Sequence, residues 1–326
     1  MILQFPQVRR PMLLVTGAGT LGREVVKLMR EDMPVRVLSH GEDAMWRCEE
    51  LNPAVVAYKH PVEYVIGDIR DREAVAKAMR GVTHVISTAA MKHVKYGSQN
   101  PTELIKTNVV GLSNLLEESL AEKVQCFVQI STDKVVNAEN IYGTSKKMGE
   151  DMVAATGQPG YCSMRFGNFL GSRGSVIQRW REQLIETGGY DNGDDPYIKL
   201  TDPKMNRFFI KPREVAEFIC THMSPCVPAG QVIAPIMKVF NMGTVAELFS
   251  QLHGGARIIE IGAGPGEKRD EHIISYREAS RTTVQPDCYI IHTHEVEDAI
   301  TFPLGTDVLP KQTAAETMAY MGEAMR

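Results

Sequence analysis

The stretch MLLVTGAGTLGREVVKLM, residues 12–29, joins an apolar run to an amphipathic helical segment through a loop with three glycines. In such a loop Gly17 permits a tight turn, Gly19 lets the backbone approach a pyrophosphate, and Gly22 lets helix and strand pack closely. The N-terminus of the following helix favours the negative charge of the phosphates. A glycine pattern alone is weak evidence and fits an ordinary turn, but its position between a strand and a helix predicts a dinucleotide site.

The first half of the chain repeats this alternation of short apolar runs and helical segments, which is typical of a parallel sheet covered by helices. We expect six strands and four helices here. The strands are predicted at 12–16, 35–39, 63–66, 84–88, 126–131 and 161–165, and the helices begin near residues 19, 72, 102 and 142.

After Gly167 the regular alternation gives way to irregular segments, and a last helix is expected over 314–326. The predicted fold class is therefore α/β: a Rossmann-like doubly wound parallel sheet with a smaller, loop-rich α/β substrate domain. We expect an NAD(P)-binding domain at 1–168, to which segments near 208–240 return, and a substrate-binding region at 169–326.

Composition excludes several other classes of protein. The net charge of −4 over 326 residues gives no basic footprint for nucleic acid. The six cysteines show no spacing that suits zinc, so no metal site is expected. No apolar stretch approaches the length of a membrane span, and residues 1–11 do not follow the pattern of a secretory signal. We expect a cytoplasmic protein without membrane or nucleic-acid partners.

The end of the second predicted strand is where a Rossmann protein reads the adenosine ribose of its cofactor. Ser39 and His40 stand there, and the strand end itself carries no carboxylate, which favours NADP over NAD, although Glu42 is close enough to reach a ribose. After the third strand, Asp68 fits either the adenosine site or a helix N-cap.

The run STDKVVNAENIYGTSK, residues 131–146, carries the catalytic candidates. Tyr142 and Lys146 are four residues apart and therefore share one face of a helix. A tyrosine with a pKa near 10 becomes a useful base at neutral pH only if its pKa falls by ~3 units, which requires ~4 kcal/mol from neighbouring positive charges. YxxxK alone is common by chance, but here STDK precedes it at the end of an apolar strand, where parallel-sheet proteins place their chemistry.

These motifs resemble the extended short-chain dehydrogenase/reductase family, and within it the inverting UDP-N-acetylglucosamine 4,6-dehydratases of polysaccharide and pseudaminic acid synthesis. The resemblance covers most of the chain and keeps the family's order of motifs. They are the Gly17 loop, GDIRD (67–71), AAMKHV (89–94), NPTELIKTNVVG (100–111), STDK with YGTSK, RFGNFLGSRGSV (165–176), LTDPKMNRFFI (200–210) and PGEKRDEHIIS (265–275).

The resemblance implies a closed redox cycle that removes water from a nucleotide sugar. Tyr142, assisted by Thr132 and Lys146, takes the proton of the hydroxyl on carbon 4 while hydride passes to NADP. Lys134 then removes the hydrogen on carbon 5, and Asp133 protonates the hydroxyl that leaves carbon 6. The retained Tyr142, together with Lys134, implies the branch that inverts carbon 5.

The resemblance also implies two sets of binding residues. The cofactor set is Gly17, Gly19, Thr20, Leu21, Gly22, Ser39, His40, Asp68, Ile69, Ala89, Ala90, Lys92, Tyr142, Lys146 and Phe166. The set for the UDP-sugar is Lys92, His93, Thr132, Asn168, Arg173, Arg207, Glu267 and Lys268. By itself, His93 is more typical of a structural histidine than of a ligand contact.

Three departures from the family pattern bear on binding. The Gly17 loop is one residue shorter than usual, His40 stands where the family carries an arginine, and Gly264 replaces the arginine before PGEK. The second change puts the preference for NADP in doubt, and the third removes an expected phosphate contact.

Two alternative functions stay open. A nucleotide-sugar 4-epimerase or 4-keto reductase would use Tyr142 without Asp133 or Lys134, and a non-catalytic nucleotide-sugar-binding protein would use neither. We also expect a homo-oligomer, paired through the helices after Asn100 and around Tyr142.

Overall fold

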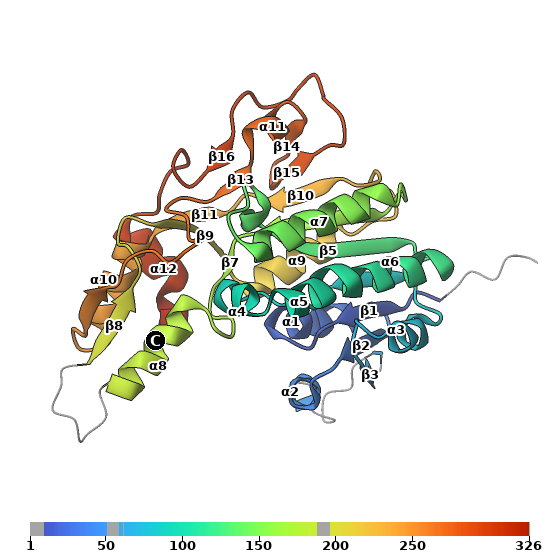
Figure 1. Cartoon of the computed structure of the whole chain (residues 1–326), viewed down its shortest axis with the longest axis horizontal. Coiled ribbons are helices and arrows are strands. Elements are labelled where there is room, and N and C mark those ends of the chain that lie inside the picture. The colour runs from blue at the N-terminus through green and yellow to red at the C-terminus, as the bar shows by residue number, and fades with distance from the viewer. Residues whose placement is uncertain (1–9, 51–58, 61, 188–195, 326) are drawn as a thin grey trace, which may run out of the picture.

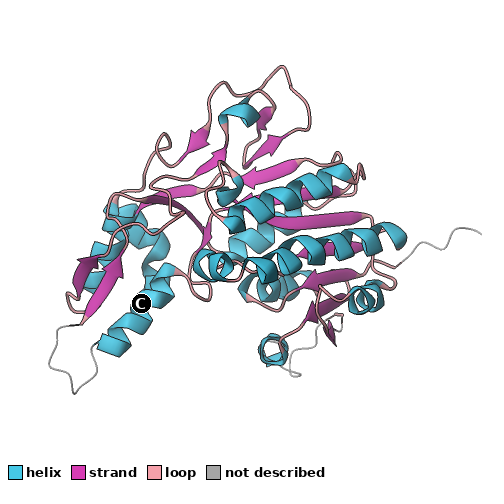
Figure 2. Cartoon of the chain, viewed as in Figure 1, coloured by secondary structure: helices cyan, strands magenta, loops and turns pink. Residues whose placement is uncertain are grey.

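The computed structural model describes residues 10–50, 59–60, 62–187 and 196–325, so the expectation about residues 1–11 lies almost wholly outside it. Its largest element is a nine-stranded sheet in the order β14-β15-β10-β6-β5-β4-β1-β2-β3 (Figures 1 and 2). In this order, the strands from β10 to β3 are parallel to one another. At the other edge, β15 pairs antiparallel with both β10 and β14. The strands are β1 Leu13–Thr16, β2 Val35–Ser39, β3 Val62–Ile66, β4 His84–Ser87, β5 Cys126–Thr132, β6 Tyr161–Phe166, β10 Val232–Pro235, β14 Thr282–Val284 and β15 Cys288–Ile291.

Alternate residues of the central strands bury opposite faces of this sheet, as the two-residue period of a strand requires. On β1, Leu13 and Val15 pack in one apolar core and Leu14 in the other. Helices α1 and α9 contribute to the first core, and α3, α6 and α7 to the second. The bounds of the helices around the sheet are α1 Thr20–Met29, α2 Glu42–Glu50, α3 Arg72–Met79, α4 Val94–Gln99, α5 Pro101–Ile105, α6 Gly111–Ala121, α7 Ile141–Ala155, α9 Pro212–His222 and α11 Tyr276–Ala279.

A second region lies beside the carboxyl ends of the parallel strands and has its own core around Trp180 and Phe249, whose rings are 5.3 Å apart. Helices α8 Val176–Thr187, α10 Met242–Leu252 and α12 Ala314–Met325 build it together with short strands. These strands are β7 Asn168–Phe169, β9 Asn206–Ile210 and β11 Lys238–Asn241 in one sheet, and β8 Tyr197–Leu200 with β12 Arg257–Glu260. A further pair, β13 His272–Ile274 with β16 Leu304–Gly305, packs its apolar side chains into the first core of the main sheet.

The α/β fold class is confirmed, and all six predicted strands are present within one or two residues of their expected ends. Two features differ from the sequence-based expectation. Residues 282–291, expected in the substrate region, add β14 and β15 to the main sheet, and residues 42–50 form a helix directly after β2. The first difference arises from pairing between distant segments, to which local periodicity is blind.

A buried ion network joins the main sheet to the second half of the chain. The Arg165 side chain on β6 is 1% exposed and donates to both carboxylate oxygens of Glu150 at 2.8 Å. It also donates to Glu278 at 2.5 and 3.0 Å and to the carbonyl of Ile273 at 2.9 Å. Because burial without partners would be costly for a guanidinium, these bonds fix α7 against α11 and β13.

Replacing Arg165 with Leu is expected to destabilise the protein by about 3–5 kcal/mol, since two buried carboxylates would lose their counter-ion. Urea unfolding followed by circular dichroism measures the loss. Arg213→Leu, which removes an exposed ion pair with Glu217, is the control and should change stability little. An equal loss of stability in the two variants would contradict the stabilising role of the buried network.

The glycine loop gives a second stability test. A Cβ on Gly22 would lie 2.0 Å from the carbonyl oxygen of Gly17, whereas a Cβ on Gly19 would meet nothing within 4 Å. We expect Gly22→Ala to cost about 1–3 kcal/mol through overpacking and Gly19→Ala to cost far less. Thermal unfolding of the two variants tests the close approach, and similar melting temperatures would refute it.

Candidate active site

The candidate site is a cavity of about 830 Å³ at the carboxyl ends of the parallel strands. The strand order reverses between β1 and β4, because the chain continues from β1 to β2 on one side and from β4 to β5 on the other. Doubly wound sheets bind their ligands at this point. The second region closes the opposite wall with residues of α8, β8 and β9. Its volume lies within the range of pockets that take small molecules and cofactors.

The glycine loop forms the cofactor end of this cavity. Gly17 has φ +88°, a left-handed conformation that glycine adopts at no steric cost, and Gly19 is the N-cap of α1. The free N–H groups of the first turn of α1 present a positive end to the cavity. No acidic side chain in this turn offsets that charge. This cradle fits a dinucleotide pyrophosphate in spite of the shortened loop.

At the adenosine end, Ser39 is buried and His40 is exposed at the end of β2. Asp68 follows β3 and accepts hydrogen bonds from the Arg70 guanidinium at 2.6 and 2.9 Å. These bonds lower the pKa of Asp68, and Arg70 also pairs with Glu103 at 2.6 Å. Asp68 is not the cap of the next helix, because Asp71 caps α3.

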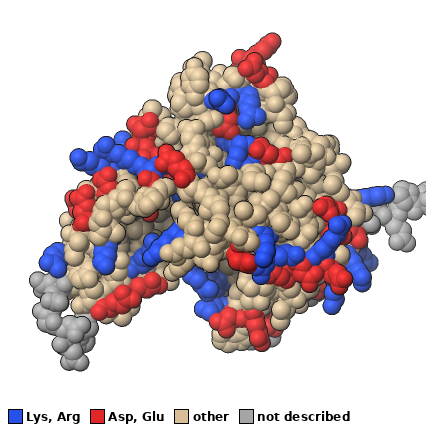
Figure 3. All heavy atoms as spheres, in the orientation of Figure 1, with Lys and Arg blue, Asp and Glu red and all other residues tan. Residues whose placement is uncertain are grey.

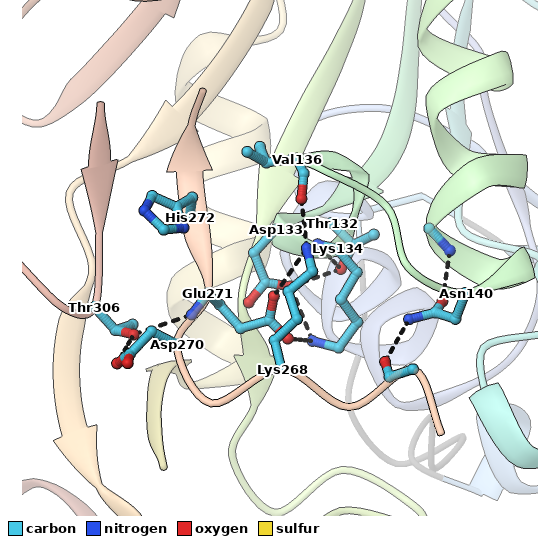
Figure 4. A network of polar contacts seen from close by, with 12 residues as sticks. Thr132, Asp133, Lys134, Val136, Asn140, Lys268, Asp270, Glu271, His272 and Thr306 are labelled. Carbon is cyan, nitrogen blue, oxygen red and sulfur yellow. Dashed lines mark hydrogen bonds and ion pairs between the residues drawn. The ribbon is translucent and has the colours of Figure 1, made fainter. Parts of the chain in front are cut away.

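The catalytic candidates of β5 follow the strand directly. Thr132 ends the strand and donates to Asp133 at 2.9 Å, and residues 133–135 form one turn of 3₁₀ helix. The Lys134 ammonium donates to the same Asp133 oxygen at 2.9 Å, and the Glu271 carboxylate lies 3.8 Å from it (Figure 4). Burial would lower the pKa of Lys134, but the two carboxylates outweigh it and raise the pKa.

Helix α7 places Tyr142 and Lys146 beside this turn. Asn140 caps the helix by accepting from the backbone N–H of Gly143, so the YxxxK spacing lies within its first two turns. Burial lowers the pKa of Lys146 to about 8, and its ammonium donates to the carbonyl of Ile130 at 2.7 Å. Burial raises the pKa of Tyr142, against the lowering effect of the Lys134 charge and of a hydrogen bond with Thr132.

Several basic side chains line the cavity. Lys92 donates to the carbonyl of Arg173 at 2.8 Å, and burial, with the Arg173 charge, lowers its pKa. Burial also lowers the pKa of His93, which keeps this ring neutral. Figure 3 shows basic side chains along the hollow between the two regions. The cationic residues that line the cavity are Arg70, Lys92, Lys134, Lys146, Arg173, Arg179, Lys199 and Arg207.

Arg207 and Lys268 hold the loop that precedes β13. Arg207 donates to the carbonyls of Asn206, Lys268 and Arg269 at 2.6–2.9 Å, and Lys268 donates to the carbonyl of Val136 at 2.5 Å. Both side chains therefore donate to the backbone, and their contact with a diphosphate stays a prediction.

The structure brings the predicted residues together. All of them line the cavity except Gly22, Asp133 and Lys268, and Asp133 lies just behind the wall with no exposed surface. Sequence reasoning missed Arg179, Lys199 and Glu271. Of these, only Glu271 carried a signal, because it stands within the quoted PGEKRDEHIIS motif.

Among the described residues, no helix combines the length and the apolar character that a membrane crossing requires.

Comparison with known proteins identifies the family. The family described as "Polysaccharide biosynthesis protein" matches residues 13–293. The chain is 31% identical over 307 residues to an uncharacterized membrane protein of Methanocaldococcus jannaschii, with 88% of this chain and 87% of the relative covered. It is 30% identical over 274 residues to a UDP-N-acetylglucosamine 4,6-dehydratase (inverting) of Campylobacter jejuni, with 82% and 78% covered.

Among solved structures, Pen from Bacillus thuringiensis matches with a TM-score of 0.86 and 26% identity, over 98% of this chain and 99% of that one. The predicted resemblance is thereby confirmed. The chain belongs to the polysaccharide biosynthesis protein family and is a nucleotide-sugar-modifying enzyme of the extended short-chain dehydrogenase/reductase type.

Proposed function

We propose that this protein is a UDP-N-acetylglucosamine 4,6-dehydratase that uses NADP and inverts carbon 5. The single observation that carries the proposal is the Asp133–Lys134 ion pair, 2.9 Å long, in which Lys134 lines the cavity with Tyr142 and Asp133 lies just behind the wall. Oxidation at carbon 4 alone, as in an epimerase, needs only Tyr142 and Lys146. Loss of water needs an additional acid and base, and the ion pair supplies both.

A nicotinamide cofactor held at the Gly17 loop would supply the hydride chemistry for oxidation at carbon 4 and reduction at carbon 6. Tyr142 takes the proton of the hydroxyl on carbon 4. Its phenolate is favoured by positive charge, which Lys134 supplies in this site, and Lys146 follows four residues later on the same helix. The resulting ketone acidifies the hydrogen on carbon 5, which prepares the elimination.

The elimination uses a proton that the pair already holds. Asp133 carboxylate with Lys134 ammonium carries the same number of protons as Asp133 carboxylic acid with Lys134 amine. Transfer of one proton across the 2.9 Å contact therefore converts the resting ion pair into an acid and a base. Lys134 then takes the hydrogen from carbon 5, and Asp133 protonates the leaving hydroxyl of carbon 6.

The substrate and cofactor assignments rest on separate grounds. The cations of the cavity wall suit a nucleoside diphosphate. Similarity to the inverting dehydratase supports the sugar and the stereochemistry. For the cofactor, His40 stands at the end of β2 without a neighbouring strand-end carboxylate, which supports NADP. The domain boundaries, a homo-oligomeric state, a cytoplasmic location and a place in pseudaminic acid synthesis stay predictions.

Lys134→Ala separates the dehydratase from an epimerase or 4-keto reductase. Without the base, loss of water from UDP-N-acetylglucosamine should slow by about 10²–10⁴-fold. Oxidation at carbon 4 should continue, so reduced cofactor should accumulate and absorb in the near ultraviolet. Water loss is followed by mass spectrometry, and exposed Lys204→Ala is the control. Unimpaired turnover by Lys134→Ala would refute the proposal.

The lowered pKa of Lys146 predicts a basic limb in the pH profile. Lys146 is charged below about pH 8 and loses its proton as the pH rises through that value, which removes positive charge from beside Tyr142. Formation of reduced cofactor should therefore decline above about pH 8. Lys146→Arg keeps the charge and should move the decline to higher pH, and Lys146→Met should be slower by about 10²-fold throughout. An unchanged basic limb in Lys146→Arg would contradict this role.

A further inference from the structure

Glu271 is a carboxyl group in the catalytic cavity for which the proposed mechanism has no use. It is 4% exposed and stands just before β13. Its carboxylate lies 3.8 Å from the Lys134 ammonium and 3.9 Å from that of Lys268. Figure 4 shows Lys134 between Asp133 and Glu271, while Lys268, from the same segment as Glu271, reaches the carbonyl of Val136.

Two carboxylate oxygens of this cluster are buried without a hydrogen-bond partner, Asp133 Oδ2 and Glu271 Oε2. Buried polar atoms are nearly always satisfied, and each exception calls for an explanation. An ionised carboxylate loses most from such a position, whereas a protonated one places less charge in it. A proton on Glu271 would reduce the charge that its unpaired oxygen places in the buried cluster.

The backbone of Glu271 is held firmly in place. Its N–H donates to Thr306 Oγ1 at 3.0 Å, and its carbonyl accepts from the N–H of Thr306 at 2.8 Å. Thr306 also donates to Asp270, which accepts in turn from Asn206 at 2.7 Å. A side chain on so constrained a backbone keeps its distance from Lys134 through the reaction.

The proposed reaction leaves the Asp133–Lys134 pair one proton short. Asp133 gives a proton to the departing water. Lys134 takes one from carbon 5 and gives one back to that carbon after hydride has returned to carbon 6. Tyr142 meanwhile has gained the proton of the hydroxyl on carbon 4. The reaction as a whole is balanced, but the pair needs a proton before the next turnover.

We propose that Glu271 returns this proton to the pair through Lys134. The protonated Glu271 gives its proton to the Lys134 amine, and the ammonium passes one to the Asp133 carboxylate. Glu271 is recharged from water at the loop of residues 264–267, whose Gly264, Pro265 and Glu267 are exposed, while Tyr142 releases its proton to solvent. Glu271 touches no reacting atom and is a positioning residue for the proton; its role rests on the proposed function.

Electrostatics around Glu271 suits this role. Burial raises its pKa, and Asp133 raises it further, so the group holds a proton at a higher pH than an ordinary glutamate. The charges of Lys134, Arg207 and Lys268 act in the opposite direction and let the proton leave. A carboxyl group under these opposing influences can both accept and give up a proton.

Glu271→Gln keeps the size of the side chain and removes its ability to carry a proton. With enzyme in excess over UDP-N-acetylglucosamine, the first loss of water should proceed near the wild-type rate. In a second experiment, with substrate in excess over enzyme, turnovers after the first should be about 10²-fold slower, so product should appear as a burst of one equivalent per site. Glu271→Asp keeps a carboxyl group and should restore much of the later rate. Exposed Glu260→Gln is the control and should show no burst.

A second readout needs no sugar. The pH dependence of Lys134 acetylation, followed by mass spectrometry, reports the pKa of Lys134, which should fall in Glu271→Gln because a neighbouring negative charge is lost. An unchanged Lys134 titration, or a first turnover slowed as much as the later ones, would overturn the relay alone. A wild-type protein that removes no water would overturn the proposed function and the relay with it.

Discussion

The charge of Arg165 holds the active site together. This guanidinium is buried among Glu150 of α7, Glu278 of α11 and the carbonyl of Ile273 in β13, and Ser131 at the end of β5 donates to the same Glu150 at 2.6 Å. One side chain thus ties together the strand that ends in Thr132, the helix that carries Tyr142 and the strand that Glu271 precedes. An arginine suits this position because it stays charged and its planar fork serves several acceptors at once.

The sequence predicted those parts of the site that are encoded locally. The glycine loop, the YxxxK pair and STDK each lie within a few residues, and strand and helix periodicity places them at the carboxyl ends of the sheet. Glu271 was missed because it meets Lys134 only through the fold, across 137 positions of sequence, and because an acidic residue in a loop is usually a solvated one. The return of residues 282–291 to the main sheet was missed for the same reason, since strand order is a tertiary property.

The cavity keeps its positive charge although the family's arginine before PGEK is replaced. Gly264 removes a cation before PGEK, yet Arg179 and Lys199 line the cavity from α8 and β8, and Arg207 fixes the backbone of the loop that follows. At the centre, Lys134 faces two carboxylates, so its charge is stabilised although burial opposes it. In the proposed mechanism one ion pair supplies both acid and base, which separates elimination from simple oxidation and reduction at carbon 4.

The most direct test of this account is the mass of the product formed from UDP-N-acetylglucosamine in deuterium oxide by the wild-type protein. A dehydratase that removes and replaces the hydrogen on carbon 5 should release a nucleotide sugar that has lost one water and carries one carbon-bound deuterium. A product of unchanged composition without carbon-bound deuterium would show chemistry confined to carbon 4 and would contradict the role of Asp133 and Lys134.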